Sequence, residues 1–390
     1  MRFYMNVWTR YQKYAEDYIG SYEIENGFTF NTQLHGGFAG ATASLNLPGN
    51  QAQYIYGLLL GSHVEIRDLY YNLVYEGFIQ EVTRSGPVLT VNMLGYYAHA
   101  DRLIDDRIYT TNPTTVQEIV EDAADLIDSW NAPIPFLSTG ADYDLMVTDP
   151  ETGAYLAIDF TDIKIKDGIE QSLAYGYSSA SPVPAYIVIY DDRTPFIITS
   201  EAFSLYKYKG YDIFIHNLTD DPGTSTSLDE VKNKIYAVYA NEGEGPSKTT
   251  AASDTFSISK YGTMEGVVQN GGNQEGLDLA EDLRDYALQI HAWPRDAISF
   301  GVTGFVQHFS GATYSPCNIR AGDSVRFPDL DLLYTIDREQ IAGASYSKYV
   351  TFVTSTSYDA STNTNTISVG LTDKRLELIM SRLGLSGGLK

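Results

Sequence analysis

The stretch Gly61-Ser62-His63-Val64-Glu65-Ile66-Arg67-Asp68 decides the fold of this chain, because a stretch of the same pattern recurs much later in it. The second copy reads Gly322-Asp323-Ser324-Val325-Arg326-Phe327-Pro328-Asp329. Each copy begins with a glycine suited to a turn and continues through two polar residues into an alternating strand that ends at an aspartate. The two stretches therefore look like copies of one structural unit.

A pair of alternating segments follows each copy. After the first copy they are residues 73–82 and 88–94, and after the second they are residues 349–358 and 366–371. In both cases a short polar turn joins the pair, which is typical of a β-hairpin. The shared order of strand and hairpin predicts two similar small, tube-like β-barrels in one chain.

The composition favours a mainly β protein of the α+β class. The chain has 390 residues, 43% of them hydrophobic and 19% charged, so it can bury a sizeable core and should form more than one domain. Its 31 tyrosines favour strands over helices. Cys317 is the single cysteine, which excludes an intramolecular disulfide and a cysteine-based zinc site.

Two targeting features are missing from the sequence. The first ten residues lack the apolar region of a signal peptide, and no window approaches the roughly 20 apolar residues of a membrane helix. We therefore expect synthesis in a cytoplasm and no membrane span.

The net charge is strongly negative, with 26 basic and 50 acidic residues giving −24. A chain this acidic repels a phosphate backbone unless a basic stripe is present, and the sequence has no long run of Lys or Arg. Stable nucleic-acid binding is disfavoured. Two interpretations stay open: the charge keeps the protein soluble, or it lines a surface that DNA passes without adhering.

Three helices are expected, at residues 115–130, 276–290 and about 372–383. The first begins at a capping box of Thr115 and Glu118. Its apolar residues recur at helical spacing, and they are Val116, Ile119, Val120, Ala123, Ile127 and Trp130.

The inserted helices divide the chain into interleaved domains. We expect a first barrel at 1–108, an inserted α+β domain at 109–227 and a helical insertion at 246–297. The second barrel, with the C-terminal helix, should combine residues 228–245 and 298–390.

This layout resembles the hub proteins of phage tails, the baseplate hub of contractile tails and the tail-tip hub, or minor tail protein, of siphophages. The matching segments are Tyr75 to Ile79, Val88 to Tyr96 followed by Asp101 to Leu103, Phe256 to Gly262, Asn318 to Val325 and Thr351 to Leu371. The segment 136–227 matches weakly. The resemblance covers most of the chain through short, degenerate motifs.

The resemblance implies a structural virion protein at the tail tip, made in the host cytoplasm. Such hubs are usually trimers, and three copies with two barrels each would match a hexameric tail tube. The implied partners are the tail tube or distal tail protein ring, the tape measure protein, and tip or fibre proteins. DNA would pass through without specific binding, and the lumen-facing candidates in the two repeats are Glu65, Asp68, Asp323 and Asp329.

Catalytic, cofactor and metal residues are not predicted. The six histidines are scattered without metal-ligand spacing, and the chain has neither a G-x-S-x-G motif nor a glycine-rich phosphate loop. His35-Gly36-Gly37 is interpreted as a loop rather than an oxyanion hole. The histidines are His35, His63, His99, His216, His291 and His308.

Two alternatives to a scaffold role remain. Paired carboxylates such as Asp142 with Asp144, or Asp191 with Asp192, could belong to a cell-wall glycoside hydrolase. A receptor- or glycan-binding module could instead use tyrosines of the middle segment, because the ring packs on a sugar while the hydroxyl hydrogen-bonds. These tyrosines are Tyr175, Tyr177, Tyr206, Tyr208 and Tyr211.

Overall fold

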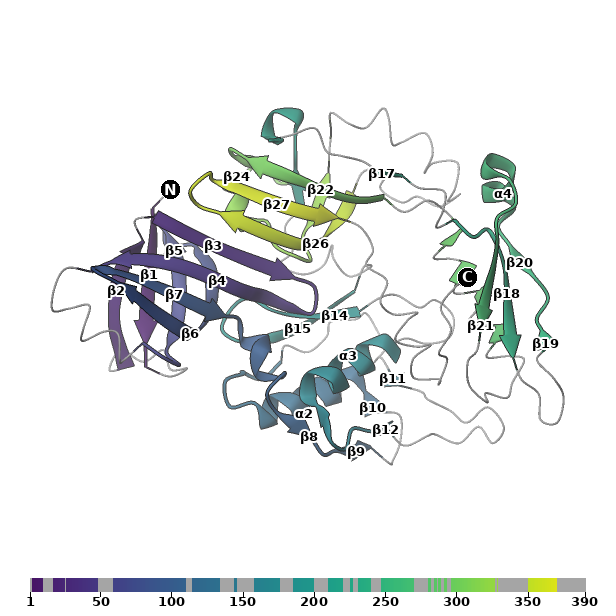
Figure 1. Cartoon of the computed structure of the whole chain (residues 1–390), viewed down its shortest axis with the longest axis horizontal. Coiled ribbons are helices and arrows are strands. Elements are labelled where there is room, and N and C mark those ends of the chain that lie inside the picture. Colours follow the sequence, from purple (N-terminus) through teal and green to yellow (C-terminus); the bar gives the residue numbers. More distant parts are fainter. Residues whose placement is uncertain are drawn as a thin grey trace.

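The architecture was obtained as a computed structural model, and it confirms a mainly β protein (Figure 1). The described residues fall into many segments. They are 2–9, 17–24, 26–47, 59–109, 114–133, 144–145, 158–175, 185–199, 210–219, 225–226, 231–239, 247–269, 280–281, 284–285, 287–288, 291–292, 296–326, 328 and 350–369.

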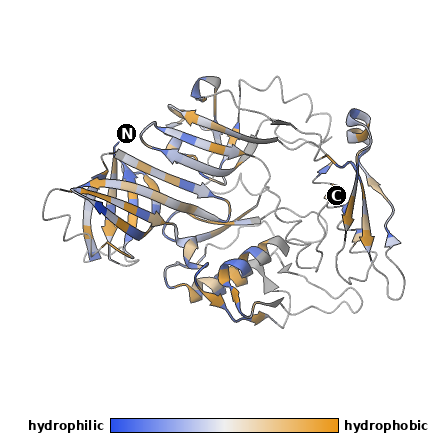
Figure 2. Ribbon diagram, viewed as in Figure 1, coloured by the Kyte–Doolittle hydropathy of each residue, from blue (hydrophilic) through white to orange (hydrophobic). Residues whose placement is uncertain are grey.

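The first strand module contains seven antiparallel strands, paired in the order β2-β1-β5-β6-β7-β4-β3. Their bounds are β1 Phe3–Trp8, β2 Tyr18–Ile24, β3 Asn26–Gln33, β4 Gly36–Asn46, β5 His63–Asp68, β6 Leu73–Ser85 and β7 Val88–Leu94. Figure 2 shows apolar and polar residues mixed along these strands. In β1 the alternate residues Phe3, Met5 and Val7 are buried in the core of the module.

The second strand module is built around the second copy of the repeat. Its bounds are β16 Gly210–Asp212, β17 Ser225–Thr226, β22 Asp296–Thr303, β23 Val306–His308, β24 Thr313–Tyr314, β25 Ser324–Arg326, β26 Val350–Asp359 and β27 Thr364–Val369. It has a separate core that includes Tyr211, Val302 and Ile367. Since β16 and β17 belong here, this module draws on residues before 228, contrary to the expected boundary.

The two copies of the repeat have the same pairing. Strand β5 pairs with β6, β6 with β7 and β7 with β4, and in the second module β25 pairs with β26, β26 with β27 and β27 with β22. All of these pairs are antiparallel. The predicted repeat is therefore a repeat of four paired strands.

The copies also agree in local detail. Gly61 N–H donates to the Ile79 carbonyl at 2.9 Å, and Gly322 N–H donates to the Val353 carbonyl at 2.8 Å. Both glycines have positive φ, +74° and +94°, which favours glycine. The first strand of each hairpin, β6 or β26, shifts register directly after the matched residue, between Ile79 and Glu81 and between Val353 and Ser355. A shared β-bulge at one register is a specific structural feature.

A layer of helices and short strands covers one side of the first module. Helix α2, Val116–Leu126, packs against α3, Ile165–Tyr175, and the hairpin of β14, Ala185–Ile189, and β15, Pro195–Thr199, joins them to the sheet. Strand β14 pairs in parallel with the start of β4. The small pairs of this layer are β8 Ile104–Asp105 with β13 Ile163–Lys164, β9 Ile108–Tyr109 with β12 Ile158–Asp159, and β10 Thr114–Thr115 with β11 Asp144–Leu145.

A four-stranded sheet lies away from both modules in Figure 1. It contains β18 Lys234–Tyr239, β19 Ser247–Lys248, β20 Ala252–Ser253 and β21 Glu265–Gln269, with helix α4, Thr255–Tyr261, beside it. We expected 228–245 to belong to the second barrel, but β18 pairs only with β19, β20 and β21 among the described residues. The proposed insertion 246–297 is thus partly a β-sheet.

The expected helices have different outcomes. Helix α2 confirms the first, and its stripe from Ile119 to Trp130 is buried. Between 276 and 290 the described residues 280, 281, 284, 285, 287 and 288 are helical. The expected helix at 372–383 lies outside the described residues. Among the helices described here, none is long and apolar enough to cross a membrane.

Candidate functional site

The two strand modules meet along a continuous line of backbone pairing. Strand β3 of the first module pairs antiparallel with β26 of the second, from Gln33 with Ser355 to Thr29 with Asp359. The Thr32 and Thr356 hydroxyls hydrogen-bond across this line at 2.7 Å and are buried. Sheet pairing of this kind fixes the orientation of one module relative to the other.

Arg320, in the turn that begins the second repeat, also links the two strand modules. Its guanidinium donates to the Leu73 carbonyl of the first module at 2.6 Å. It also lies over the rings of Phe38 and Tyr190, 4.7 and 5.2 Å from their centroids. Tyr190 in turn donates its hydroxyl to the Ala321 carbonyl at 2.5 Å, so three parts of the chain converge here.

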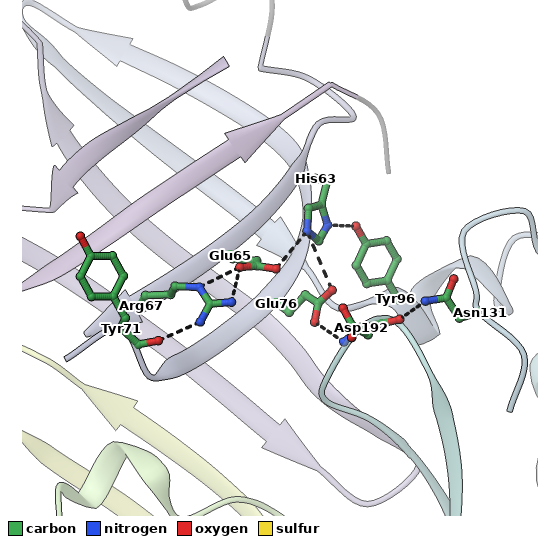
Figure 3. A network of polar contacts seen from close by, with 8 residues as sticks. All are labelled: His63, Glu65, Arg67, Tyr71, Glu76, Tyr96, Asn131 and Asp192. Carbon is green, nitrogen blue, oxygen red and sulfur yellow. Dashed lines mark hydrogen bonds and ion pairs between the residues drawn. The ribbon is translucent and has the colours of Figure 1, made fainter. Parts of the chain in front are cut away.

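A second concentration of polar side chains lies on β5 and β6 of the first module, on the face covered by the turn around Asp192 (Figure 3). His63, Glu65 and Glu76 are only 0%, 4% and 2% exposed. Glu65 and Glu76 are directly opposite each other in the ladder, while His63 lies two residues before Glu65 on the same face. His63 Nε2 is 3.7 Å from Glu65 Oε1 and 3.9 Å from Glu76 Oε1. We call these three residues the His–Glu cluster.

Each member of the His–Glu cluster also has a partner on its other polar atom. His63 Nδ1 hydrogen-bonds with the Tyr96 hydroxyl, and Arg67 binds Glu65 Oε2 through Nε at 2.8 Å and Nη2 at 2.6 Å. The Asp192 backbone N–H donates to Glu76 Oε2 at 2.8 Å. One nitrogen and two oxygens that lie within 4.8 Å of one another form a set that could hold a metal ion.

The amino-acid sequence alone led us to expect no metal ligands, so this cluster was not predicted. The available signal was H-x-E on a strand, with a second glutamate on the strand that follows. Recognising it requires the register that sets Glu76 opposite Glu65, and that register follows from the hairpin turn rather than from residue spacing alone.

The lumen-facing candidates lie elsewhere than expected. Glu65, Asp68 and Asp323 are 4%, 3% and 5% exposed, so their expected lumen-facing position is wrong: burial within one chain removes them from any channel surface. Asp68 accepts the Tyr70 and Asn72 backbone N–H groups at 2.8 and 2.9 Å, which builds the turn after β5. Asp323 likewise accepts the Arg320 N–H at 2.8 Å. Asp329 lies outside the described residues.

The turn built by Asp68 presents exposed apolar residues. Leu69, Tyr70 and Tyr71 are 51%, 80% and 79% exposed. Tyr71 has a φ of +64°, and its carbonyl accepts a hydrogen bond from Arg67 Nη1 at 2.8 Å. The tip between β5 and β6 is therefore an ordered, apolar projection.

The remaining candidates for chemistry have structural positions. His35 lies in the tight turn between β3 and β4, as expected of a loop, and Gly36 is the first residue of β4. Tyr211 is fully buried in the second core, where a sugar could not reach its ring, and the other four tyrosines have no described surroundings. Burial raises the pKa of the Cys317 thiol to about 11, so it stays protonated and unreactive at neutral pH.

Comparison with known proteins identifies the fold of the chain. No protein-family model matches the sequence, and no curated protein matches it significantly. Among solved structures, the 43 kDa tail protein of prophage MuSo2 from Shewanella oneidensis matches with a TM-score of 0.58 at 11% identity. That alignment covers 95% of this chain and 98% of the other. The chain has the fold of phage tail proteins.

Two further tail proteins have the same architecture over nearly their whole length. Prophage tail protein gp18 from Listeria monocytogenes EGD-e has a TM-score of 0.52 and 13% identity, covering 98% of both chains. The tail protein from Neisseria meningitidis MC58 has a TM-score of 0.51 and 10% identity, covering 96% of this chain and 98% of that one. The phage-tail resemblance predicted from short motifs is confirmed as a likeness of fold.

Proposed function

We propose that this protein is a structural component of a phage tail, a hub whose two strand modules serve as two copies of a tube-forming unit. The observation that carries the proposal is the duplication. Both modules repeat one strand order, one positive-φ glycine turn and one bulge position, and β3 pairs with β26 to join them. A rigid pair of similar units is what a symmetry adaptor needs.

Three copies would present six such units. A ring of three chains could then face a hexameric tail tube or distal tail protein ring with matched contacts. The apposed partners in this arrangement are the tube on one side and tip or fibre proteins on the other, with the tape measure protein in the channel. In this proposal the protein lies at the tail tip of the virion.

The charge of −24 fits a conduit that DNA crosses without adhering. Since three of the four named lumen candidates are buried, the proposal rests on the charge of the whole chain and names no lumen residue. We propose no catalytic role, because the fold is shared with tail proteins and the polar cluster of the first module is enclosed rather than open to a substrate.

The test is the mass of the assembly in solution. Light scattering coupled to size-exclusion chromatography should give three times the chain mass of 43.2 kDa for the protein alone, or three copies of this chain in the complex formed with the cognate tube protein. A complex of six chains, or a monomer under both conditions, would contradict the trimeric adaptor. The Arg320→Ala variant gives a second test. It should weaken assembly more than Arg84→Ala at the exposed end of β6, because it removes contacts between the two modules.

A further inference from the structure

We propose that the His–Glu cluster binds one divalent transition-metal cation, of which Zn²⁺ is the probe. The ligands would be His63 Nε2, Glu65 Oε1 and Glu76 Oε1. The site would be structural, tying β5 to β6 of the first module, and it is independent of the role proposed for the protein in a tail.

The separations of the ligand atoms carry the inference. Nε2 lies 3.7 and 3.9 Å from the two carboxylate oxygens. A protonated imidazole that paired directly with a carboxylate would approach to about 2.7–2.9 Å. Ligands that share one ion at about 2.0–2.2 Å in a tetrahedral arrangement stand roughly 3.3–3.6 Å apart. The observed distances match a shared ion better than a direct ion pair.

The outer partners orient all three ligand atoms toward one point, as Figure 3 shows. Tyr96 engages Nδ1 of the imidazole, which turns Nε2 to the carboxylates. Arg67 engages Oε2 of Glu65 and the Asp192 N–H engages Oε2 of Glu76, so in each case Oε1 faces the histidine. Metal ligands in proteins are typically held by such contacts on their second atom.

The electrostatics of the cluster favour a cation. Two carboxylates lie buried together, and the Arg67 guanidinium balances one of their charges. Burying two carboxylates close together is costly, so a positive ion held between them would stabilise the folded chain. An imidazole ligand favours Zn²⁺ and similar transition metals over Mg²⁺ and Ca²⁺, which prefer oxygen ligands alone.

The hairpin of β14 and β15 approaches the first module at this site. Asp192, in the turn of that hairpin, contacts Glu76 through its backbone N–H and accepts a hydrogen bond from Asn131 Nδ2 at 2.5 Å on its carbonyl. Asn131 follows helix α2 in the chain. A metal ion that held Glu76 in place would therefore also stabilise the contact between the first module and the inserted layer of helices and short strands.

The direct experiment is metal analysis of the whole chain. The protein is unfolded in denaturant with EDTA, freed of chelator and refolded with or without Zn²⁺, since a buried site loads during folding. After dialysis, elemental mass spectrometry should find about one zinc per chain, and the zinc-refolded protein should melt at a higher temperature than the metal-free one.

Variants identify the ligands. His63→Gln and Glu76→Gln should each lose the bound zinc, whereas the exposed His216→Gln and Glu81→Gln should retain it. Tyr96→Phe keeps every ligand but removes the outer contact on Nδ1, so its zinc affinity, measured by chelator competition, should fall by about tenfold or more. If His63→Gln and Glu76→Gln fail to fold, the zinc affinity of Tyr96→Phe still tests whether the cluster binds the metal.

Two results would overturn the proposal. Wild-type protein that refolds without retaining zinc would show that the cluster does not bind the ion. Zinc retained equally by wild type, His63→Gln and Glu76→Gln would place the metal elsewhere in the chain.

Discussion

Gly37 lies at the start of β4, where the backbone of β14 runs alongside it. A Cβ atom on this residue would stand 2.5 Å from the Ile189 carbonyl oxygen, and its φ is +74°. Gly86, in the turn between β6 and β7, has a similar φ of +62° but nothing within 4 Å of a Cβ. Comparing alanine variants of these two glycines therefore separates the free-energy cost of steric contact from that of the backbone conformation.

We predict that Gly37→Ala loses more stability than Gly86→Ala. Both variants incur about 1–2 kcal/mol for an alanine at positive φ. Gly37→Ala should lose about 1–3 kcal/mol beyond that, because the β4–β14 pair must separate. Urea unfolding of the two variants measures the difference, and equal losses would mean that β14 does not pack against β4 as described.

His99 gives a prediction about pH. Its ring stacks on Phe78 with centroids 4.2 Å apart, and Nδ1 hydrogen-bonds with Ser129 Oγ at 2.5 Å. Burial, together with the Arg102 cation, lowers its pKa from 6.5 to about 4. The folded protein thus holds His99 neutral, while the unfolded chain binds a proton there below pH 6.5, so the stability from this group declines as the pH falls toward 4.

The change that tests it is His99→Gln, which removes the titrating ring. Between pH 7 and pH 4 the free energy of unfolding of the wild type should fall by about 2 kcal/mol more than that of the variant. Carboxylate titration is common to both proteins and cancels in the comparison. Parallel pH profiles would show that His99 is protonated equally well in the folded state.

Glu65 shows what a sequence cannot convey at one position. The alternation of Val64 and Ile66 with polar residues predicts a strand with one solvated face, and the strand is present as β5. The polar face is nevertheless buried, because the distant turn around Asp192 contacts Glu76 on the same sheet. The burial of Glu65 depends on that long-range contact, which no local pattern encodes.

Helix α2 tests the amphipathic pattern from which it was predicted. Ile119 is fully buried against the layer that contains Ile169 and Leu173, whereas Leu126 on the same helix is 48% exposed. Ile119→Asp should cost about 3 kcal/mol or more, since it buries an unpaired charge. Leu126→Asp should stay within about 1 kcal/mol of the wild type. Equal thermal stabilities of the two variants would contradict the packing.

Other elements were harder to predict than α2. Helix α3 was missed because Asp-Gly and similar turn signals dominate residues 136–219, although Ile165, Ile169 and Leu173 recur at four-residue spacing on its buried face. Helix α4 is a single short segment capped by Asp254, whose side chain accepts from the Phe256 and Ser257 N–H groups. Short elements of this kind depend on caps and tertiary contacts more than on periodicity.

The hairpins were predicted well because their signal is local. The segment 88–94 matches β7 in both bounds, and 73–82 lies inside β6. By contrast, β18 was assigned to the wrong sheet, since alternation identifies a strand but not its partners. Which strands pair is decided by connections and packing over the whole chain.

The whole chain provides a prediction about DNA. Its charge of −24 repels a phosphate backbone, and phosphate contacts are strongest at low salt. The purified protein should therefore not retard duplex DNA in a gel at about 50 mM salt. A basic DNA-binding protein serves as the positive control. Retardation by the wild type at this salt would leave solubility as the sole explanation of the acidity.

The central claim is that the two strand modules occupy equivalent places around one axis. The most direct measurement is a cryo-electron microscopy structure of the assembled ring, alone or on the tail tube. The account predicts three chains whose turns at Gly61 and Gly322 alternate around the axis, related by a rotation of about 60°. A ring lined by one module alone, or one without threefold symmetry, would contradict it.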